Sequence, residues 1–527
     1  MTRATPRALR GMVTAPHHLA AQAGRDVLAD GGSAVEAAVA TAACLAVVYP
    51  HMTGIGGDGF WLVAEPDGGH WAIDGCGAAA MAADPGLYRD HATIPWRGAL
   101  AANTVAGTVG GWQAALTRSG STLPLDRLLR DAIHHGRSGV VVTAGGAQVA
   151  ATVSAALRDL PGDYARIFEP EGRPLVEGDV LRQPAPATTL ERLAADGLDG
   201  FYRGALAQAI ADDLARLGSP VAAGDLAAFA ARPVDPLAVT IAGARLFNLP
   251  PPTQGVASLL ILALFDRLGA ATCNGFDHVH HLVEATKQAF RWRDVHVGDP
   301  ATMTQDAQAL LDDAAALDDM AAAVDPARAA PWPHPPALGD TTWFGAADAR
   351  GQVVSCIQST YFEFGSGIVL PQTGITWQNR GCSFALGGEG PNRLRPGARP
   401  FHTLNPALAR FDDGRVMAYG TMGGEGQPQT QAAIFTRHAR FGQPLQAAVD
   451  GPRWLLGRTW GDQSTTLKIE DGFDPALYAQ LEAAGHAVER VAAWSSTMGH
   501  AGAIVRHPDG VIEGAADPRS DGMVATW

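Results

Sequence analysis

The sequence has no basic cluster and no long uncharged apolar run. It contains 39 Lys and Arg against 53 Asp and Glu, which gives a formal net charge of −14 at neutral pH. Nucleic acids and anionic membranes are bound by clustered Lys and Arg, so neither is expected as a partner. The longest apolar stretch, from Ala34 to Pro50, contains Glu36. It falls short of the roughly 18 uncharged residues that a membrane span needs, and it predicts a buried helix.

Cysteine is scarce. The five cysteines, at positions 44, 76, 273, 356 and 382, are odd in number and show no CxxC or Cys/His ligand spacing. We therefore expect reduced thiols, with no disulfide framework and no zinc site. The first residues, MTRATPRALRGMVTAPHH, include basic residues but lack the apolar core and cleavage site of a secretory signal. A cytoplasmic location is expected.

Hydrophobic residues make up 47% of the chain, which is a globular composition. Apolar spacing predicts helices over residues 18–30, 33–48, 125–136, 187–195, 204–217, 255–268, 277–293 and 307–330. Strands are expected over FWLVAE after Gly59 and over residues 342–349, 352–358, 374–379, 415–419, 466–470 and 501–506. Residues 331–336 (PWPHPP) predict an extended, exposed linker. A helix-rich part followed by a sheet-rich part favours one layered α/β body.

Two local patterns resemble ligand sites, but their context disfavours this. Gly54, Gly56 and Gly59 in GIGGDG satisfy GxGxxG, yet the run follows a helix and precedes a strand, the reverse of the dinucleotide-binding context. His278 and His281 in DHVHH are three residues apart, without a third ligand of known geometry. We therefore expect neither a nucleotide nor a metal, and no cofactor.

The segment GDTTWFGAAD, which begins at Gly339, offers a candidate nucleophile. A Thr hydroxyl needs a base beside it, and a Thr at a chain's N-terminus has one in its own α-amine, whose pKa is about 8. This chemistry requires a cut before the Thr. On the pattern alone, Asp-Thr before a strand is more often a turn without a catalytic role, so both interpretations stay open.

Several further segments stand in order along the chain. They are GMVTAPHHLAAQAGRDVLADGGSAVEAAVA, GIGGDGFWLV, LPPPTQGV, VHHLVEATKQAFRWRD, TTWFGAAD, FGSGIVLPQTGI, GTMGGEGQPQ and GAADPRSDG. Together these motifs resemble the γ-glutamyltransferase family of N-terminal nucleophile hydrolases. The resemblance implies an αββα fold and self-cleavage into a large subunit (1–340) and a small subunit (341–527) that form one intertwined unit. It leaves open whether two such heterodimers associate.

The resemblance also assigns roles to individual residues. Thr341 is the expected nucleophile, and Asp340 ends the large subunit. Ser359 stands where the family has a Thr whose hydroxyl bonds to the nucleophile's amine and hydroxyl. Gly423 and Gly424 match the pair whose backbone N–H groups form the oxyanion hole.

The residues that hold a glutamyl substrate in the family differ in this sequence. Cys382 and Ser383 replace the acidic pair that binds the α-amino group. Cys76 takes the position of the Arg that binds the α-carboxylate, and His402 and Thr403 replace a Ser-Ser pair with the same task. Three losses around one ligand disfavour glutathione as the substrate.

Arg380 stands beside the lost acidic pair, in WQNRGCSF. A guanidinium can hold a carboxylate through two parallel hydrogen bonds, and a structural or surface role is the alternative. We assign Asn379 to the same expected substrate pocket as His402, Thr403 and Ser383. Arg97 is a second candidate, for which bonding to the backbone carbonyls of a loop is the preferred interpretation.

The NRGxSF form, the GGDGFWL turn and GGEGQPQTQA resemble the branch that contains oxamate amidohydrolases and cephalosporin-acylase-like proteins. The leading hypothesis is hydrolysis of a small carboxylate-bearing amide, oxamate to oxalate and ammonia, through an acyl-enzyme on Thr341. The alternatives are a γ-glutamyl hydrolase or transferase acting on glutathione, a glutaryl-type cephalosporin acylase, and an unprocessed homologue without catalytic activity.

Overall fold

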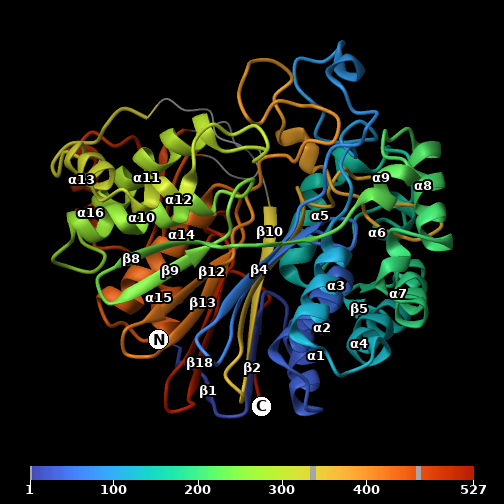
Figure 1. The fold of residues 1–527 in the computed structure, drawn as a ribbon, viewed down its shortest axis with the longest axis horizontal. Coiled ribbons are helices and arrows are strands. Elements are labelled where there is room, and N and C mark those ends of the chain that lie inside the picture. Colours follow the sequence, from blue (N-terminus) through green and yellow to red (C-terminus); the bar gives the residue numbers. More distant parts are fainter. Residues whose placement is uncertain (1–2, 333–339, 458–464) are drawn as a thin grey trace.

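The computed structural model describes residues 3–332, 340–457 and 465–527, and its centre is a pair of stacked sheets (Figure 1). One sheet has the strand order β1 (Arg7–Ala8), β18 (Ile512–Ala516), β17 (Ala501–Arg506), β13 (Val416–Thr421), β12 (Ala407–Phe411), β9 (Ala244–Asn248) and β8 (Leu237–Ile241). The other has the order β19 (Met523–Thr526), β2 (Gly11–Ala15), β10 (Asp340–Asp348), β11 (Val353–Tyr361), β3 (Asp58–Ala64), β4 (His70–Gly75) and β7 (Arg232–Val234). Both sheets are antiparallel.

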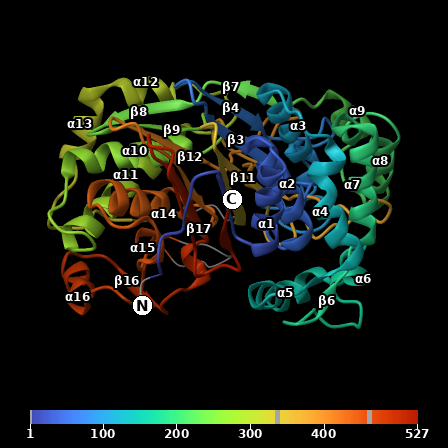
Figure 2. The same ribbon diagram turned by 90° about the horizontal axis from the view of Figure 1, so that it is seen from below.

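Helices cover the outer face of each sheet, which gives four layers (Figure 2). Beside the β10 sheet lie α1 (His18–Ala29), α2 (Ala34–Val48), α3 (Thr108–Ser119), α4 (Leu125–Ser138) and α7 (Pro184–Asp196), and outside them α5 (Ala144–Leu157), α6 (Tyr164–Phe168), α8 (Ala205–Leu217) and α9 (Ala223–Ala228). Beside the β13 sheet lie α10 (Gly255–Leu268), α11 (Phe276–His296), α12 (Ala307–Asp312), α13 (Ala314–Ala322), α14 (Gly426–Phe435), α15 (Leu445–Asp450) and α16 (Pro475–Ala483). Two smaller sheets consist of β14 (Trp454–Leu456), β15 (Leu467–Glu470) and β16 (Val488–Val491), and of β5 (Val140–Val141) and β6 (Val180–Leu181). This arrangement confirms the expected αββα fold class.

Local sequence explains why the innermost helices form. Ser33 caps α2: its Oγ accepts from the N–H of Glu36 at 3.1 Å, and Glu36 Oε2 accepts from the N–H of Ser33 at 2.7 Å. This reciprocal capping box satisfies two backbone donors that a helix N-terminus leaves free. The helix is buried on nearly every side, as expected for the apolar run in the sequence.

The apolar layer between the two sheets is close-packed around Trp343 of β10. The indole is 2% exposed and donates from Nε1 to Ser355 Oγ at 2.9 Å. Its ring lies against Gly420 of β13 and Gly502 of β17, where an added Cβ would come within 2.2 Å and 2.5 Å of ring carbons. Two glycines therefore make room for the largest side chain in the layer, and they fix how the sheets face each other.

Most of the expected elements are confirmed, with shifts of a few residues at their ends. The single helix expected over residues 307–330 is wrong: the structure has two helices, α12 and α13, which are separated at Asp313, and the second ends at Ala322. Pro326 disfavours helical backbone at Asp325, the residue before it. The strand expected over 374–379 is also wrong. The backbone N–H groups of Trp377 and Gln378 bond to two different loop residues, Ile368 and Gly56, so they do not form a ladder with one partner.

The division into a helix-rich and a sheet-rich part is only approximate. Strands β8 and β9 come from the first 340 residues, and β9 pairs with β12 from the last part of the chain. Likewise β10 pairs with β2 and β11 pairs with β3. The expected linker at 331–336 lies outside the described residues from position 333 onward. Of the helices that the structure describes, none has both the length and the apolar character needed to cross a bilayer.

Replacing Gly420 with Ala tests the packing of the two sheets. The new methyl group would overlap the Trp343 indole, and we expect a loss of about 1 to 3 kcal/mol in the free energy of unfolding, measured from the urea midpoint. Gly200→Ala is the control, because no atom lies within 4 Å of a Cβ there. Equal midpoints for the two variants would contradict this account.

Candidate active site

Thr341 lies at a β-bulge at the start of β10. The strand pairs Asp340 with Tyr361 and Thr342 with Gln358 of β11. Between these two pairs β10 has one residue, Thr341, while β11 has two, Ser359 and Thr360. Bulges of this kind redirect side chains and are frequent beside active sites. Thr341 is fully buried.

The glycine run GIGGDG supports this bulge from the next strand. A Cβ on Gly57 would lie 2.0 Å from the carbonyl oxygen of Ser359, and one on Gly56 would lie 2.3 Å from the carbonyl oxygen of Thr376. Glycine is required at both positions because the backbone of neighbouring segments approaches so closely. The run therefore has a packing role.

The turn between β13 and α14 carries the expected oxyanion glycines. Gly423 and Gly424 have φ angles of 114° and 52°, which favour glycine. The carbonyls of Gly423 and Gly424 accept from the N–H groups of Gly426 and Gln427 at 2.8 Å and 3.3 Å. In the first turn of α14, Gln427 donates from Nε2 to Thr341 Oγ1 at 3.2 Å. This contact places the glycine turn beside the candidate nucleophile.

A buried polar network fixes the glycine turn from behind. The side chain of Gln254 donates from Nε2 to the carbonyls of Thr403 and Gly424 at 2.7 Å and 2.8 Å. Arg293 of α11 donates to Gln254 Oε1 at 2.9 Å and to Glu425 Oε1 at 2.8 Å. All the hydrogen-bonding groups of this network are buried, and such networks hold a single geometry when their members are satisfied.

Arg380 is fully buried beside the β-bulge. Its guanidinium carbon lies 3.4 Å from the centroid of the Tyr361 ring, and Nη2 donates to Thr403 Oγ1 at 3.2 Å. Within the described residues, neither Nε nor Nη1 has a hydrogen-bond partner. A buried donor without a partner is costly, so this guanidinium has unused capacity for an anionic ligand.

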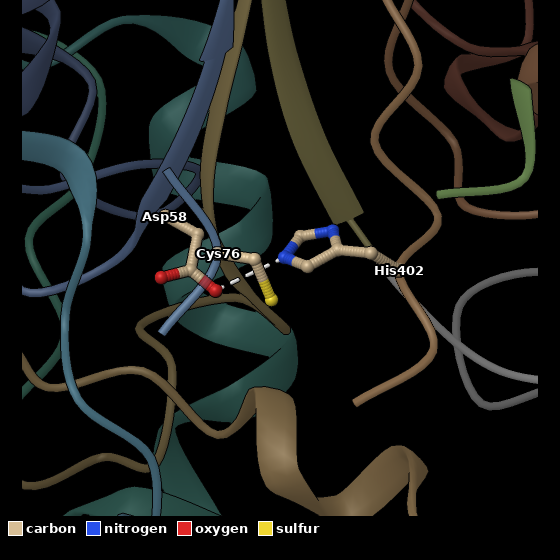
Figure 3. Close-up of side chains that lie close together, drawn as sticks. All are labelled: Asp58, Cys76 and His402. Carbon is tan, nitrogen blue, oxygen red and sulfur yellow. Dashed lines mark hydrogen bonds and ion pairs between the residues drawn. The ribbon is translucent and has the colours of Figure 1, made fainter. Parts of the chain in front are cut away.

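Near Arg380 lie Asp58, Cys76 and His402, whose potential ligand atoms lie within 4.8 Å of one another (Figure 3). Asp58 Oδ1 accepts from two backbone N–H groups and from Gln378, while Oδ2 lies 3.0 Å from His402 Nε2. Burial lowers the pKa of His402 well below its ordinary value, so the ring is neutral. Since the N–H of Leu404 points at Nδ1, Nε2 carries the proton and donates to Asp58.

These three residues could hold a metal ion, but two features oppose it. The His402 Nε2 proton is used on Asp58, and the positive charge of Arg380 acts on both Asp58 and Cys76. A second buried group, His280, Glu284 and His486, has the same compactness. There the Lys287 ammonium already donates to Glu284 at 2.6 Å, which places a positive charge where a metal would bind.

The histidines of DHVHH have other partners. His278 Nε2 bonds to the Thr436 hydroxyl at 2.8 Å, and His281 Nδ1 bonds to the Gly269 carbonyl at 2.7 Å. Both therefore serve the packing of α11. Arg97 donates to the carbonyls of Glu363 and Gly365, as the preferred interpretation of this residue stated.

The remaining residues assigned to the substrate pocket have different partners in the structure. Thr403 contacts Arg380 directly, and His402 faces Asp58. Asn379 uses its side chain on the Phe362 N–H and the Trp96 carbonyl, so it orders the loop beside the pocket. Ser383 is half-buried and donates to the Phe401 carbonyl at 3.0 Å.

Several residues of the site were missed by sequence reasoning. Gln427 and Gln254 lie inside the motifs GTMGGEGQPQ and LPPPTQGV, so their segments were identified without their roles. Asp58, in GIGGDG, had no assigned role either. The available signal was a polar side chain in an otherwise glycine-rich or proline-rich motif, and it could not say which atom each side chain faces.

Comparison with known proteins gives consistent relatives across the whole chain. The family model for gamma-glutamyltranspeptidase matches residues 20–527. The oxamate amidohydrolase proenzyme of Klebsiella pneumoniae is 52% identical over 521 residues, which cover 98% of each chain. The glutathione hydrolase proenzyme of Escherichia coli is 31% identical over 546 residues, covering 98% of this chain and 91% of that protein. A crystal structure of cephalosporin acylase from Bacillus halodurans matches with a TM-score of 0.92 at 32% identity, covering 100% of this chain and 97% of that one.

Asp58 gives the stability of the fold a pH dependence that can be measured. Burial raises the pKa of Asp58 from 3.8 to about 7, so the folded state holds a proton that the unfolded chain releases. Between about pH 4 and pH 7 this group therefore lowers stability as pH rises, by at most about 1.4 kcal/mol for each pH unit. The Asp58→Asn variant has no titrating group at this position, so its stability does not fall with pH for this reason.

The measurement is the urea midpoint of both proteins at pH 5 and pH 7. We expect the stability of Asp58→Asn relative to the unsubstituted protein to increase between these two values. Both proteins are compared at the same two pH values, so contributions from groups that do not contact Asp58 cancel in the difference. A difference that does not change with pH would show that the Asp58 carboxyl is ionised throughout.

Proposed function

Since the chain belongs to the gamma-glutamyltranspeptidase family, we propose that Thr341 is the nucleophile of a self-processing amidohydrolase whose substrate is a small carboxylate-bearing amide, oxamate first. The family and the fold inferred from the motifs are both confirmed. The chain is an enzyme of the hydrolase class, as its relatives are. The substrate and the roles of individual residues are the subject of the proposal.

Self-cleavage comes first in the proposed sequence. The Thr341 hydroxyl attacks the carbonyl carbon of Asp340, the C–N bond breaks, and the Asp340 acyl group moves onto Oγ1 as an ester. Water hydrolyses that ester and leaves Thr341 with a free α-amine. This amine is the base that the nucleophile lacks in the uncut chain, where the same nitrogen is an amide.

Amide hydrolysis follows the same path with the substrate in place of Asp340. The α-amine takes the proton of Oγ1 while Oγ1 attacks the amide carbon. The N–H groups of Gly423 and Gly424 stabilise the resulting oxyanion. Ammonia leaves with the transferred proton, and water hydrolyses the acyl-enzyme to the free acid. The β-bulge and the contact between Gln427 and Thr341 support this placement of the nucleophile.

One observation carries the choice of substrate: Arg380 is fully buried, and two of its nitrogens have no hydrogen-bond partner within the described residues. A carboxylate would bind Nε or Nη1 together with the second proton of Nη2, which is the two-point geometry that guanidinium favours. Tyr361, which Arg380 covers, pairs with the residue just before Thr341. A short acid such as oxamate suits this small separation along the chain, and the oxamate amidohydrolase relative at 52% identity supports it.

The γ-glutamyl alternative lacks support in the pocket. Ser383 uses its hydroxyl on a backbone carbonyl, and burial raises the pKa of Cys382 to about 12, so the thiol is neutral. Neither side chain provides the negative charge that a substrate ammonium needs when it is desolvated. A glutaryl-type amide would also satisfy Arg380, and the cephalosporin acylase neighbour keeps that candidate in view.

We also propose that the two products of cleavage stay together as one unit and that two such units can pair. A cytoplasmic location is part of the proposal, and it is supported by the five cysteines, all of which are free thiols.

Thr341→Ala should remain a single chain, whereas the unsubstituted protein should yield two chains, the second beginning with Thr341. Thr342→Ala is the matched control, because the neighbouring hydroxyl donates to the Gln358 carbonyl and has no part in the cut. Intact mass and N-terminal sequencing measure both. An unsubstituted protein that stays whole would instead favour the catalytically silent alternative.

Arg380 variants should lose activity selectively on carboxylate substrates. A charge-assisted hydrogen bond contributes about 1.5 to 3 kcal/mol, so Arg380→Ala should lower kcat/KM for oxamate by about tenfold to somewhat over a hundredfold. Arg380→Lys should lower it less, since an ammonium cannot form the two-point bond. Oxamide, in which a second amide replaces the carboxylate, is the matched control substrate.

Processing of each Arg380 variant is checked first by mass. Equal losses on oxamate and oxamide would place Arg380 in the structure of the pocket and not in carboxylate binding. Better hydrolysis of γ-glutamyl anilides than of oxamate by the unsubstituted enzyme would overturn the proposed substrate class.

A further inference from the structure

Gln427 donates a hydrogen bond from Nε2 to the hydroxyl oxygen of Thr341 at 3.2 Å, and both residues are fully buried. We propose that Gln427 is a catalytic residue that stabilises Thr341 Oγ1 when this oxygen leaves the acyl group during ester hydrolysis. The inference rests on the proposed role of Thr341 as the nucleophile. It assigns the second half of the reaction to a donor other than the oxyanion glycines.

The direction of the hydrogen bond follows from the neighbouring groups. Asn405 Nδ2 lies 2.9 Å from the Thr403 carbonyl, which can only accept, so the nitrogen of the Asn405 amide is on that side. The same Nδ2 lies 3.1 Å from Gln427 Oε1 and donates to it. The Gln427 amide is therefore held with its oxygen towards Asn405 and its nitrogen towards Thr341 Oγ1.

Asn405 is itself held on several sides. Its Oδ1 accepts from the Ser258 hydroxyl at 2.8 Å, and its backbone carbonyl accepts from Gln431 at 2.6 Å. The side chains of Asn405, Ser258, Gln431 and Gln427 are all buried. If the Gln427 amide rotated by half a turn, its nitrogen would face the nitrogen of the Asn405 amide, which is unfavourable. The N–H donor is therefore already oriented towards Thr341 Oγ1 before the reaction, and little free energy is needed to orient it.

Gln427 also belongs to the same rigid element as the oxyanion turn. Its backbone N–H donates to the Gly424 carbonyl at 3.3 Å, and it sits in the first turn of α14. The turn thus presents donors to two different oxygens. The Gly423 and Gly424 N–H groups serve the carbonyl oxygen of the substrate, and the Gln427 amide serves the oxygen of the nucleophile.

The chemistry needs a donor at this position when the acyl-enzyme breaks down. Water attacks the ester carbon and gives its proton to the Thr341 α-amine. The C–Oγ1 bond then breaks, Oγ1 takes the bonding electrons, and the amine returns the proton to it. Negative charge develops on Oγ1 before that proton arrives. A hydrogen bond to a charged oxygen is stronger than one to a neutral hydroxyl, so the Gln427 donor favours this transition state over the ground state.

The test compares Gln427→Leu and Gln427→Glu with a matched control, Gln429→Leu. Gln429 is a buried glutamine of the same helix, with an amide that bonds to the backbone of Leu456 on β14. The Leu variant removes the donor and also the bond to Asn405. The Glu variant keeps the shape and can still accept from Asn405. Once it is ionised it has no proton to donate to Oγ1, so its rate above neutral pH decides the matter if the Leu variant does not fold.

We expect kcat on oxamate to fall by about tenfold to a hundredfold in both Gln427 variants, with a parallel fall in KM. Mass spectrometry during turnover should then show the acyl group attached to the chain of residues 341–527, because hydrolysis of the ester has become the slow step. Gln429→Leu should show little acylated chain. Rates within twofold of the unsubstituted enzyme, or a slow rate without acylated chain, would overturn the proposal.

Self-cleavage gives a second readout that does not depend on any amide substrate. The precursor of both Gln427 variants should accumulate the Asp340 ester on Thr341, and hydroxylamine, which cleaves esters, should restore rapid formation of two chains. If the unsubstituted enzyme processes itself but hydrolyses none of the amides, the proposed substrate fails while this assay still tests Gln427. Processing of the Gln427 variants that is slow and insensitive to hydroxylamine would contradict the role.

Discussion

Face-to-face packing of the two sheets is the contact on which the site depends. The β-bulge of Thr341 begins β10, and the glycine turn follows β13, which belongs to the opposite sheet. Trp343, two residues after Thr341, lies against Gly420, three residues before Gly423. Because protein interiors are close-packed and transmit small displacements, this one aromatic contact sets the separation between Thr341 and the Gly423–Gly424 turn, the proposed nucleophile and oxyanion donors.

The electrostatics of the pocket are unusual for a buried site. Arg380 is buried without a full set of partners, while Asp58 already has four donors directed at its two oxygens. The free protein thus keeps an unsatisfied cation next to a satisfied carboxyl. A small acid that bound there would accept hydrogen bonds from the guanidinium. These bonds would offset the free-energy cost of burying the Arg380 side chain.

Sequence reasoning succeeded where the determinants are local. The apolar spacing over residues 33–48 predicted α2, and the capping box of Ser33 and Glu36 begins this helix in the structure. The role of Arg380 as a carboxylate ligand stays a prediction. Pairing between distant segments, such as β9 with β12, could not be predicted, because it depends on tertiary packing. The same holds for Gln427. Its amide is oriented by Asn405 and Thr403, and nothing in the local sequence encodes which of its two polar atoms faces Thr341.

The interleaving of strands has a consequence for how long the enzyme lasts once it is cut. The proposed break before Thr341 would leave β10 and β11 inserted between β2 and β3, and would leave β12 paired with β9. Dissociation of the two products would therefore require several backbone ladders and the apolar layer between the sheets to come apart together. The peptide bond at the cut contributes nothing to those contacts. Cleavage would break one covalent bond and leave the non-covalent contacts between the two fragments in place. The fragments would then separate only when the whole fold unfolds.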